Sequence, residues 1–229
     1  MKINQDIKVA VDAVVFGYTE NVLKILLIKQ KFGTNEDKWA LPGGFVKNKE
    51  SLDEAVSREL KEETGVVANY LEQLYTFGSL NRDERARVIS VSYIALINPK
   101  NYSLKADTDA IDAKWFAISH IPKLAFDHKE ILKKGIERLQ AKISYQPIGF
   151  ELLDLKFPFS DLENLYQTIL KKKIDRRNFR KKLLSFKILN ETNEFQKNVS
   201  GRPAKLYSFN KKKYRELERD GFHFEIKLV

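Results

Sequence analysis

The sequence predicts an α+β protein with two domains, and three observations support this prediction. Residues 9–118 alternate short aliphatic and β-branched runs with one well-capped helix, which is typical of an α+β domain. Residues after 145 indicate two helices joined by a short turn and followed by a hairpin. The chain has 229 residues, which exceeds the length of one ordinary domain.

Composition excludes several classes of protein. With 43% hydrophobic residues the chain can fill packed cores, and without cysteine it has neither disulfides nor thiolate zinc sites. The N-terminal apolar run is short and interrupted by Asp12, unlike a signal peptide or a membrane span. We therefore expect a soluble, cytoplasmic protein without a membrane partner.

Six runs predict the strands of the first domain. Residues 9–18 and 22–31 are β-branched and aliphatic and are separated by Thr19, Glu20 and Asn21, so they predict an antiparallel pair. The other predicted strands are residues 39–46, 68–77, 87–97 and 110–118.

The stretch between Ser51 and Gly65 predicts one helix. Ser51 followed three residues later by Glu54 is a capping box, and Gly65 is a natural residue just past a helix end. The residues that share its apolar face are Leu52, Ala55, Val56 and Leu60.

Three carboxylates, those of Glu59, Glu62 and Glu63, project within or beside this apolar stripe at the C-terminal end of the helix. They repel one another, lose hydration and face the negative end of the helix dipole, so a cation must compensate them. Arg58 neutralises only part of this charge, whereas Mg²⁺ binds carboxylate oxygens together with substrate phosphates. A solvated, charged helix end is the alternative.

Residues 44–66 resemble the complete Nudix box, because every defined position of that pattern is filled in one register. The defined residues are Gly44, Glu50, Arg58, Glu59, Leu60, Glu62, Glu63, Gly65 and Val66. The resemblance implies a Nudix fold, which is an α/β/α sandwich with a mixed sheet. It also implies hydrolysis of a nucleoside diphosphate linked to another moiety.

The same resemblance implies the catalytic roles. It places Mg²⁺ or Mn²⁺ on Glu59, Glu62 and Glu63, with Glu50 and Arg58 in support, while water attacks a phosphorus. The turn Pro42-Gly43-Gly44 precedes the box. Glycines there let backbone groups approach a phosphate or a metal, although a simple tight turn also explains them.

The polar loop of residues 78–87 is rich in arginine. Arg82 and Arg85 can contact a diphosphate, and Asp83 or Glu84 can serve as a further metal ligand or as a base. Charged loops are usually just solvated, which is the alternative. The loop looks like that of Nudix proteins that handle ADP-ribose.

The boundary between the domains is predicted at residues 145–149, which gives domains 1–144 and 145–229. A helix over about residues 126–142 closes the first domain, and its His128 is assigned a capping or surface role. Residues 145–229 hold 19 lysines and arginines against 11 acidic residues, so they carry +8 of the total charge of +10. This asymmetry indicates a polyanionic partner, with nucleic acid first, while solubility alone is the alternative.

The second domain has the pattern of a winged helix-turn-helix. Ser160 with Glu163 predicts a capping box that starts one helix, and Asp175 predicts the N-cap of a second, basic helix. Residues 187–190 and 205–209 predict a hairpin that forms the wing. The residues expected to bind double-stranded DNA are Arg176, Arg177, Asn178, Arg180, Lys181, Arg202 and Lys205. A small basic domain for protein contacts is the alternative.

Nearly the whole chain resembles the Nudix-related transcriptional regulators, which include NrtR-type regulators of NAD metabolism and AraR-type regulators of arabinose use. The stretches that carry this resemblance are FDHKEIL, YQPIGFELL, IDRRNFRKKLL and GRPAKLYSF. It implies a Nudix domain that senses a small molecule, such as ADP-ribose or a related nucleotide or sugar. It also implies a winged helix that binds operator DNA, usually in a homodimer.

These observations leave two main interpretations. In the first, the protein is a transcription regulator with an effector-binding Nudix domain, and its intact box leaves hydrolysis open. In the second, it is a metal-dependent Nudix hydrolase, similar to ADP-ribose pyrophosphatases, whose basic domain serves dimerisation or substrate capture. A third, in which the box is vestigial and the pocket binds a sugar, is weaker because Glu59, Glu62 and Glu63 are all present.

Overall fold

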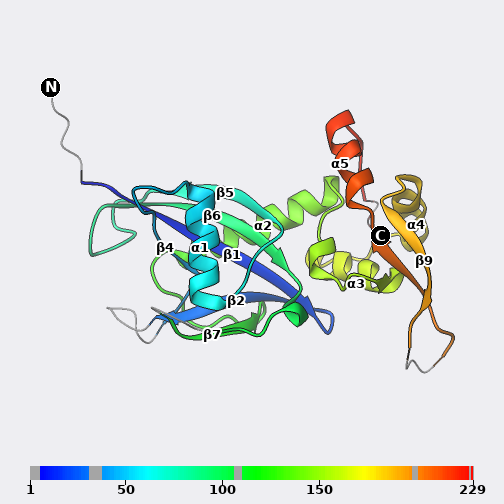
Figure 1. The fold of residues 1–229 in the computed structure, drawn as a ribbon, viewed down its shortest axis with the longest axis horizontal. Helices are drawn as coiled ribbons and strands as arrows, with labels where there is room; N and C mark the ends of the chain where they lie inside the picture. Colours follow the sequence, from blue (N-terminus) through cyan, green and yellow to red (C-terminus); the bar gives the residue numbers. More distant parts are fainter. Residues whose placement is uncertain (1–5, 31–37, 106–109, 198–200, 227, 229) are drawn as a thin grey trace. The chain divides into compact units, whose positions relative to one another are not determined.

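The computed structural model describes residues 6–30, 38–105, 110–197, 201–226 and 228 (Figure 1). The chain forms two compact units, residues 1–19 with 24–138 and residues 20–23 with 139–229. Helix α2 (His128–Tyr145) continues from the first unit into the second. The predicted domain limits, 1–144 and 145–229, remain a prediction.

The first unit is organised around a seven-stranded mixed sheet, and all six predicted runs form strands in it. The strands are β1 (Lys8–Thr19), β2 (Val22–Gln30), β3 (Trp39–Ala40), β4 (Gly43–Phe45), β5 (Leu71–Phe77), β6 (Val88–Ile97) and β7 (Ala110–Ala117). The main path runs β3-β2-β1-β6-β5, with β4 paired to β1 and β7 paired to β2. The sheet is mixed because β1 and β6 are parallel, whereas β5 and β6 are antiparallel.

The predicted β1–β2 pair is a tight hairpin. The two strands are hydrogen-bonded neighbours, and only Glu20 and Asn21 connect them. Both residues have positive φ, 54° and 59°. Two consecutive residues of this conformation form the turn that matches the twist of antiparallel strands.

The predicted box helix is confirmed as α1 (Leu52–Thr64). Its capping box between Ser51 and Glu54 is present, and Gly65 ends the helix in the left-handed conformation with φ of 74°. The buried face of α1 contributes Ala55, Val56 and Leu60 to a core with one side of the sheet.

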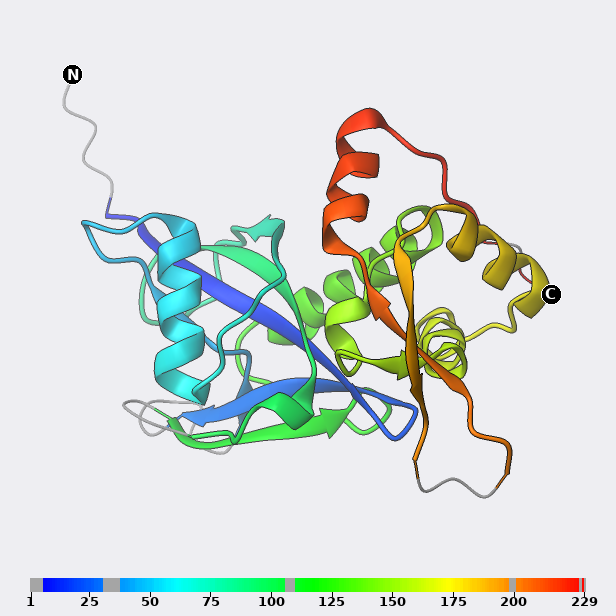
Figure 2. The same cartoon turned by 45° about the vertical axis from the view of Figure 1, so that its right-hand side comes forward.

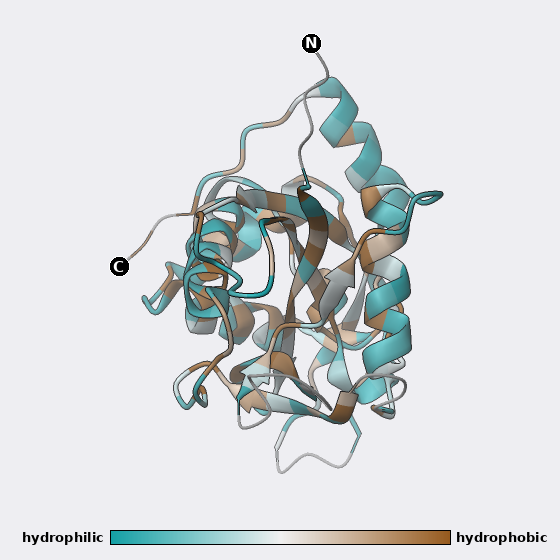
Figure 3. Ribbon diagram, turned by 90° about the vertical axis from the view of Figure 1, so that its left-hand side faces the viewer, coloured by the Kyte–Doolittle hydropathy of each residue, from teal (hydrophilic) through white to brown (hydrophobic). Residues whose placement is uncertain are grey.

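Helices cover both faces of the sheet, which confirms the predicted α/β/α sandwich. Val11, Ala13 and Val15 of β1 belong to the core under α1. Val14 points to the other face, where a Cβ at Gly135 of α2 would come within 2.9 Å of its side chain. Strand side chains alternate between faces, so one strand serves two helical layers. Figure 3 shows mainly hydrophobic strands and helices whose outer sides are hydrophilic.

The second unit is a winged helix domain. Its helices are α3 (Phe159–Leu170), α4 (Arg176–Ser185) and α5 (Lys211–Asp220), and its strands are β8 (Phe157–Pro158), β9 (Leu189–Phe195) and β10 (Lys205–Phe209). The strands form a sheet in the order β8-β10-β9. Figure 2 shows β9 and β10 running together as one hairpin, which is the predicted wing. Short 3₁₀ turns lie at Pro99–Asn101 and Phe150–Leu152.

Three local predictions for this unit differ from the structure. The capping box of Ser160 and Glu163 is wrong, because α3 starts two residues earlier, with Pro158 as the N-cap and no side-chain cap. The Glu163 carboxylate instead binds Arg176 of α4. Strand β9 extends to Phe195, beyond the predicted residues 187–190, and β8 and α5 were not predicted.

Aromatic side chains fill the core of the second unit. Tyr166, Phe159 and Phe179 are buried, and Phe179 contacts both of the others. Tyr207 of the wing packs edge-on against Phe159. The wing and the two helices therefore share one core. Throughout the described ranges, no helix combines the length and the apolar character that a bilayer crossing requires.

Candidate functional site

The guanidinium of Arg58 on α1 binds three glutamates. Its Nε and Nη2 donate to the two oxygens of Glu50, at 2.9 and 2.6 Å. Its Nη1 donates to Glu59 Oε1 at 2.7 Å and to Glu62 Oε2 at 3.1 Å. Of the three carboxylates whose charge Arg58 is predicted to neutralise in part, it thus binds Glu59 and Glu62. It also fixes Glu50 with the geometry of a strong bidentate pair.

Two glycines bring the backbone of β4 against this cluster. The Gly43 N–H donates to Glu63 Oε2 at 2.8 Å. A Cβ at Gly43 would lie 2.1 Å from the carbonyl oxygen of Val11, and one at Gly44 would lie 2.5 Å from Glu59 Oε1. Neither glycine has a positive φ. The close approach, rather than the conformation of a turn, therefore explains both glycines.

The surroundings shift the pKa values of Glu50 and Glu59 in opposite directions. The hydrogen bonds from Arg58 and from the Lys47 backbone lower the pKa of Glu50 to about 2. Burial raises the pKa of Glu59, although Arg58 opposes this. Glu59 is thus a poorly solvated carboxylate that a further cation would stabilise.

Replacing Glu50 with glutamine is expected to destabilise the fold at pH 7, and this effect should diminish in acid. The folded-state pKa of about 2 lies below the ordinary 4.5, so ionised Glu50 stabilises the fold fully above pH 4.5. That contribution is lost as the pH falls from 4.5 to 2. Urea denaturation of the parent and of Glu50→Gln from pH 7 down to about pH 3 measures the difference, and a difference that stays constant would contradict the assignment.

A cavity of about 400 Å³ opens beside the box cluster. Glu59 and Glu63 line it, together with both glycines of the turn and with Arg82 and Arg85 from the loop of residues 78–87. Glu62 is not in this lining, because its carboxylate pairs with Arg58 and is 40% exposed. The structure therefore brings two of the three predicted metal ligands into the cavity.

The carboxylates fit a hard divalent cation that shares its shell with a ligand. Among the described residues, no group of three or more His, Cys, Asp or Glu side chains is arranged as a complete metal site. Glu59 and Glu63 nevertheless face one cavity, and the missing side chain at Gly44 lets its backbone approach Glu59 closely. Two carboxylates with ligand phosphates is a shell that Mg²⁺ accepts.

Arg82 is buried in a polar network rather than exposed on its loop. Its Nε and Nη2 donate to Asp127 at 2.9 and 2.7 Å, and Nη2 also reaches Asp12 Oδ2 at 3.3 Å. The Ser90 hydroxyl also donates to Asp12. The alternative of a merely solvated loop is therefore wrong at Arg82, which is fixed between β1 and the start of α2. Its contact with a diphosphate stays a prediction.

His128 belongs to the same network, so its predicted capping or surface role is wrong. The ring is buried, and its Nδ1 accepts a hydrogen bond from the Leu41 N–H at 2.9 Å. Its Nε2 lies 3.4 Å from Asp12 Oδ1. Burial lowers the pKa of His128, which favours the neutral ring with its proton on Nε2.

Arg85 and Asp83 form a second pair at the rim of the cavity. Arg85 donates from its backbone N and its Nε to Asp83 Oδ1, at 3.0 and 2.9 Å, and its guanidinium lies 5.2 Å from the centre of the Phe126 ring. This pairing lowers the pKa of Asp83. Asp83 is thus a weaker base than an unpaired aspartate.

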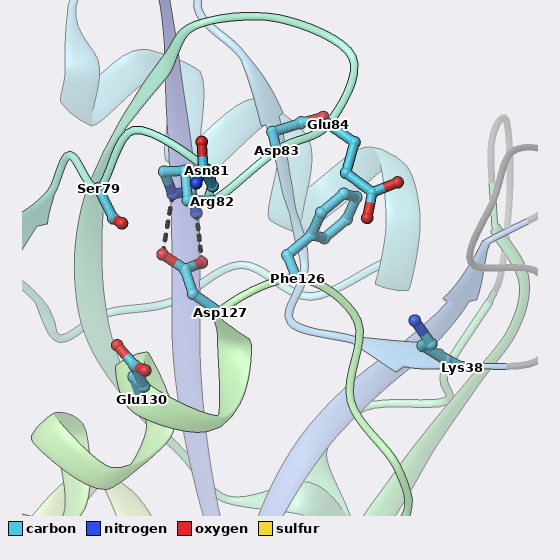
Figure 4. A pocket seen from close by; sticks show the side chains of 9 residues that line it. All are labelled: Lys38, Ser79, Asn81, Arg82, Asp83, Glu84, Phe126, Asp127 and Glu130. Carbon is cyan, nitrogen blue, oxygen red and sulfur yellow. Dashed lines mark hydrogen bonds and ion pairs between the residues drawn. The ribbon is translucent and has the colours of Figure 1, made fainter.

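A second cavity of about 410 Å³ adjoins the first, and Arg82, Asp83 and Phe126 line both (Figure 4). Figure 4 shows the two hydrogen bonds between Arg82 and Asp127 at its wall. The other lining residues are polar or charged: Lys38, Ser79, Asn81, Glu84 and Glu130. An elongated polar ligand can therefore occupy the pair of cavities across Arg82.

The predicted DNA-binding residues of α4 divide into two groups. Arg176 binds Glu163 at 2.9 and 2.8 Å, and Arg180 donates to the Tyr207 hydroxyl at 2.7 Å with its guanidinium 4.6 Å from the Phe159 ring centre. These two arginines fasten α4 to α3 and to the wing. Asp175 is the N-cap, as predicted, and accepts from the Asn178 N–H at 3.0 Å.

Arg177 and Lys181 form the exposed basic face of α4. They lie four residues apart and on the side away from the buried Phe179 and Leu183. Asn178 is partly exposed beside them. The wing contributes exposed Arg202, whereas Lys205 pairs with Glu191 of the neighbouring strand. Arg177, Lys181 and Arg202 are thus exposed, as are Arg176 and Arg180, which in addition bind Glu163 and Tyr207.

The partners of Arg82 were not predicted from the sequence. From the sequence, Asp12 was noted only as an interruption of an apolar run. Phe126 and Asp127 were noted only as the start of a helix. A carboxylate in the middle of a buried strand is a signal that could have indicated a buried polar network. No local spacing could have indicated Asp127, because 45 residues separate it from Arg82.

Two family models match the chain. A NUDIX domain model matches residues 6–135, and an NrtR DNA-binding winged helix domain model matches residues 149–209. Among curated proteins, the ADPR responsive transcriptional repressor NtrR of Acinetobacter baylyi is 34% identical over 204 residues, which are 87% of this chain and 80% of that protein. The ADP-ribose pyrophosphatase of Methanocaldococcus jannaschii is 45% identical over 125 residues, 55% of this chain and 70% of that enzyme.

Solved structures give the same result for the fold. Shewanella oneidensis NrtR complexed with a 27mer DNA matches with a TM-score of 0.80 at 30% identity, over 96% of this chain and 99% of that one. The NUDIX domain of the same regulator complexed with ADP ribose matches with a TM-score of 0.56 at 35% identity, over 59% of this chain and 90% of that one.

Proposed function

The chain belongs to the Nudix family, among the NrtR-type DNA-binding transcription regulators, and from this premise we propose that ADP-ribose is the effector of its Nudix domain. The observation that supports this choice best is the pair of adjoining cavities across Arg82. ADP-ribose is elongated, polar and dianionic at its centre. It therefore suits two polar cavities that meet at a guanidinium.

The residues around the first cavity suit the diphosphate. Arg85 lines its rim, with a half-exposed guanidinium that can donate to phosphate oxygens. A bound Mg²⁺ or Mn²⁺ would neutralise the repulsion between the diphosphate and the carboxylates of Glu59 and Glu63. Arg58 holds Glu59 in place from the other side. The four predicted effector-binding residues, Gly43, Gly44, Arg82 and Arg85, all line this cavity.

Hydrolysis of the effector is a second candidate function. It is favoured by the complete box, in which Glu50, Arg58 and Glu59 are already hydrogen-bonded into one cluster. A metal would polarise the phosphate, and Glu84 beside the second cavity is the candidate base. The related ADP-ribose pyrophosphatase makes ADP-ribose the first substrate to assay.

DNA binding is assigned to the winged helix. We propose that α4 enters the major groove with Arg177, Asn178 and Lys181, while Arg202 on the wing contacts the phosphate backbone. A homodimer, which the resemblance to these regulators implies, would place two such helices on half-sites about 10 base pairs apart, or a multiple of that. Sedimentation of the protein with and without DNA tests the dimer.

A mobility-shift titration tests the assignment of specific DNA binding. The protein is expected to bind the DNA upstream of its own gene about 10³-fold or more tightly than a scrambled duplex at physiological salt. The measurement is the ratio of the two dissociation constants at one salt concentration. Equal, weak binding of both duplexes would show that the basic domain binds DNA without sequence specificity.

A further inference from the structure

One ion pair joins the wall of the effector cavities to the start of α2. Arg82 and Asp127 share two hydrogen bonds, and their side chains are only 4% and 11% exposed. Both residues line the second cavity, and Arg82 lines the first as well. A bidentate guanidinium–carboxylate pair in such surroundings has two distinct states, made and broken, rather than a continuum.

The charge around Arg82 is out of balance. Asp12 and Asp127 share this one guanidinium, and the neutral His128 ring adds no positive charge. An effector diphosphate brings further negative charge to the same cation. Phosphate and Asp127 therefore compete for the donors of Arg82.

Asp12 and Asp127 differ in how firmly they are held. Asp12 lies within β1, between its pairings with β4 and β6, and it also accepts from the Ser90 hydroxyl. Asp127 lies in the connection that leads into α2, and Arg82 is the group that anchors its carboxylate. Asp127 is therefore the partner that a phosphate displaces more easily.

The backbone next to Asp127 can change conformation when the ion pair opens. The preceding Phe126 has a φ of 49°, which is a strained conformation for a bulky residue, and its ring lines both cavities. The carbonyl of Asp127 accepts from the N–H groups of Glu130 and Ile131, so it begins the first turn of α2. Loss of the ion pair would let this strain relax at the first turn of the helix.

Helix α2 is a continuous element that follows Asp127 directly. It runs without a break from His128 to Tyr145 and belongs to both compact units. We infer that the Arg82–Asp127 ion pair is the switch of the effector response. The pair opens when a phosphate of the effector binds Arg82. Asp127 and the start of α2 are then released. Asp127 is thus a positioning residue for regulation. The inference rests on the proposed function, because it requires a phosphate-bearing effector in these cavities.

The test compares the coupling between ADP-ribose and DNA in the parent and in Asp127→Asn. Coupling is the ratio of the DNA dissociation constants with and without saturating ADP-ribose, and factors of about 5 to 150 are typical. We expect such a factor in the parent and a ratio near one in Asp127→Asn. ADP-ribose itself should still bind the variant, as measured by calorimetry.

A matched control is Glu137→Gln, which also replaces a carboxylate with an amide on α2 but is exposed and does not pair with Arg82. It should keep the coupling of the parent. Asp127→Ser, which preserves a good helix-start residue, serves as a second variant if Asp127→Asn is unfolded, and it should also lose the coupling. Amide hydrogen exchange over residues 126–133 should rise with ADP-ribose in the parent and be high from the start in both variants.

The outcomes separate the inference from the proposed function. Full coupling in a folded Asp127 variant would overturn the switch and leave the regulator intact. Loss of ADP-ribose binding in those variants would also overturn it, because Asp127 would then be a ligand contact. A parent that binds no ADP-ribose would overturn both.

Discussion

Arg177→Ala is expected to weaken binding to operator DNA by about 1–3 kcal/mol, a factor of roughly 5 to 150, with a smaller effect on scrambled DNA. Arg177 lies on the exposed side of α4, opposite Phe179 and Leu183. An arginine there can reach a guanine edge with two hydrogen bonds. Fluorescence anisotropy with both duplexes measures the effect, and an equal loss on both would identify a phosphate contact instead.

Arg180 and Lys181 provide the comparison for that measurement. Lys181 is exposed, so Lys181→Ala should lower the slope of log affinity against log salt by about one phosphate contact. Arg180 binds the Tyr207 hydroxyl and the Phe159 ring instead. Arg180→Gln should therefore weaken specific binding while leaving the salt slope unchanged. A reduced slope would place Arg180 on the DNA.

Glu63→Gln and Glu59→Gln are expected to abolish most metal-dependent hydrolysis of ADP-ribose if the protein turns it over. Both carboxylates line the first cavity. Loss of metal-assisted charge stabilisation is worth several kcal/mol, which corresponds to about a hundredfold to a thousandfold in rate. Phosphatase-coupled phosphate release measures turnover, and Mn²⁺ calorimetry measures metal binding independently.

Variants of Glu62 and Lys61 on the same helix serve as comparisons for this test. Glu62→Gln should have the smaller effect of the three box variants, because its carboxylate is 40% exposed and outside the cavity lining. Lys61→Gln, an exposed change on the same helix, should leave the rate unchanged. An unchanged metal affinity in a Glu59 and Glu63 double variant would move the metal site elsewhere.

Local patterns were sufficient to predict most of the fold. The capping box of Ser51 and Glu54 and the left-handed Gly65 determine α1, and the aliphatic runs determine the strands. These signals lie within a few residues of one another, so the sequence displays them directly. The predicted capping box of Ser160 is wrong for two reasons. Pro158 is already the N-cap of the helix, and the Glu163 carboxylate binds Arg176 of α4.

Long-range contacts could not be predicted from spacing. The network of Asp12, Arg82 and Asp127 joins three segments that are distant along the chain. The division of the α4 arginines depends on Glu163 and on Tyr207 of the wing. In both cases the sequence identified the basic residues but not the partners that decide their roles. Arginine in a polar loop or helix can serve a ligand or a neighbouring side chain equally well.

The most direct test of the central claim is a titration of ADP-ribose into the complex of the protein with fluorescent upstream DNA. ADP-ribose is predicted to change the DNA dissociation constant by about 5- to 150-fold, and DNA should change the ADP-ribose affinity by the same factor. AMP, which lacks the diphosphate and the second ribose, should have little effect. A DNA dissociation constant that is the same with and without saturating ADP-ribose would contradict the account.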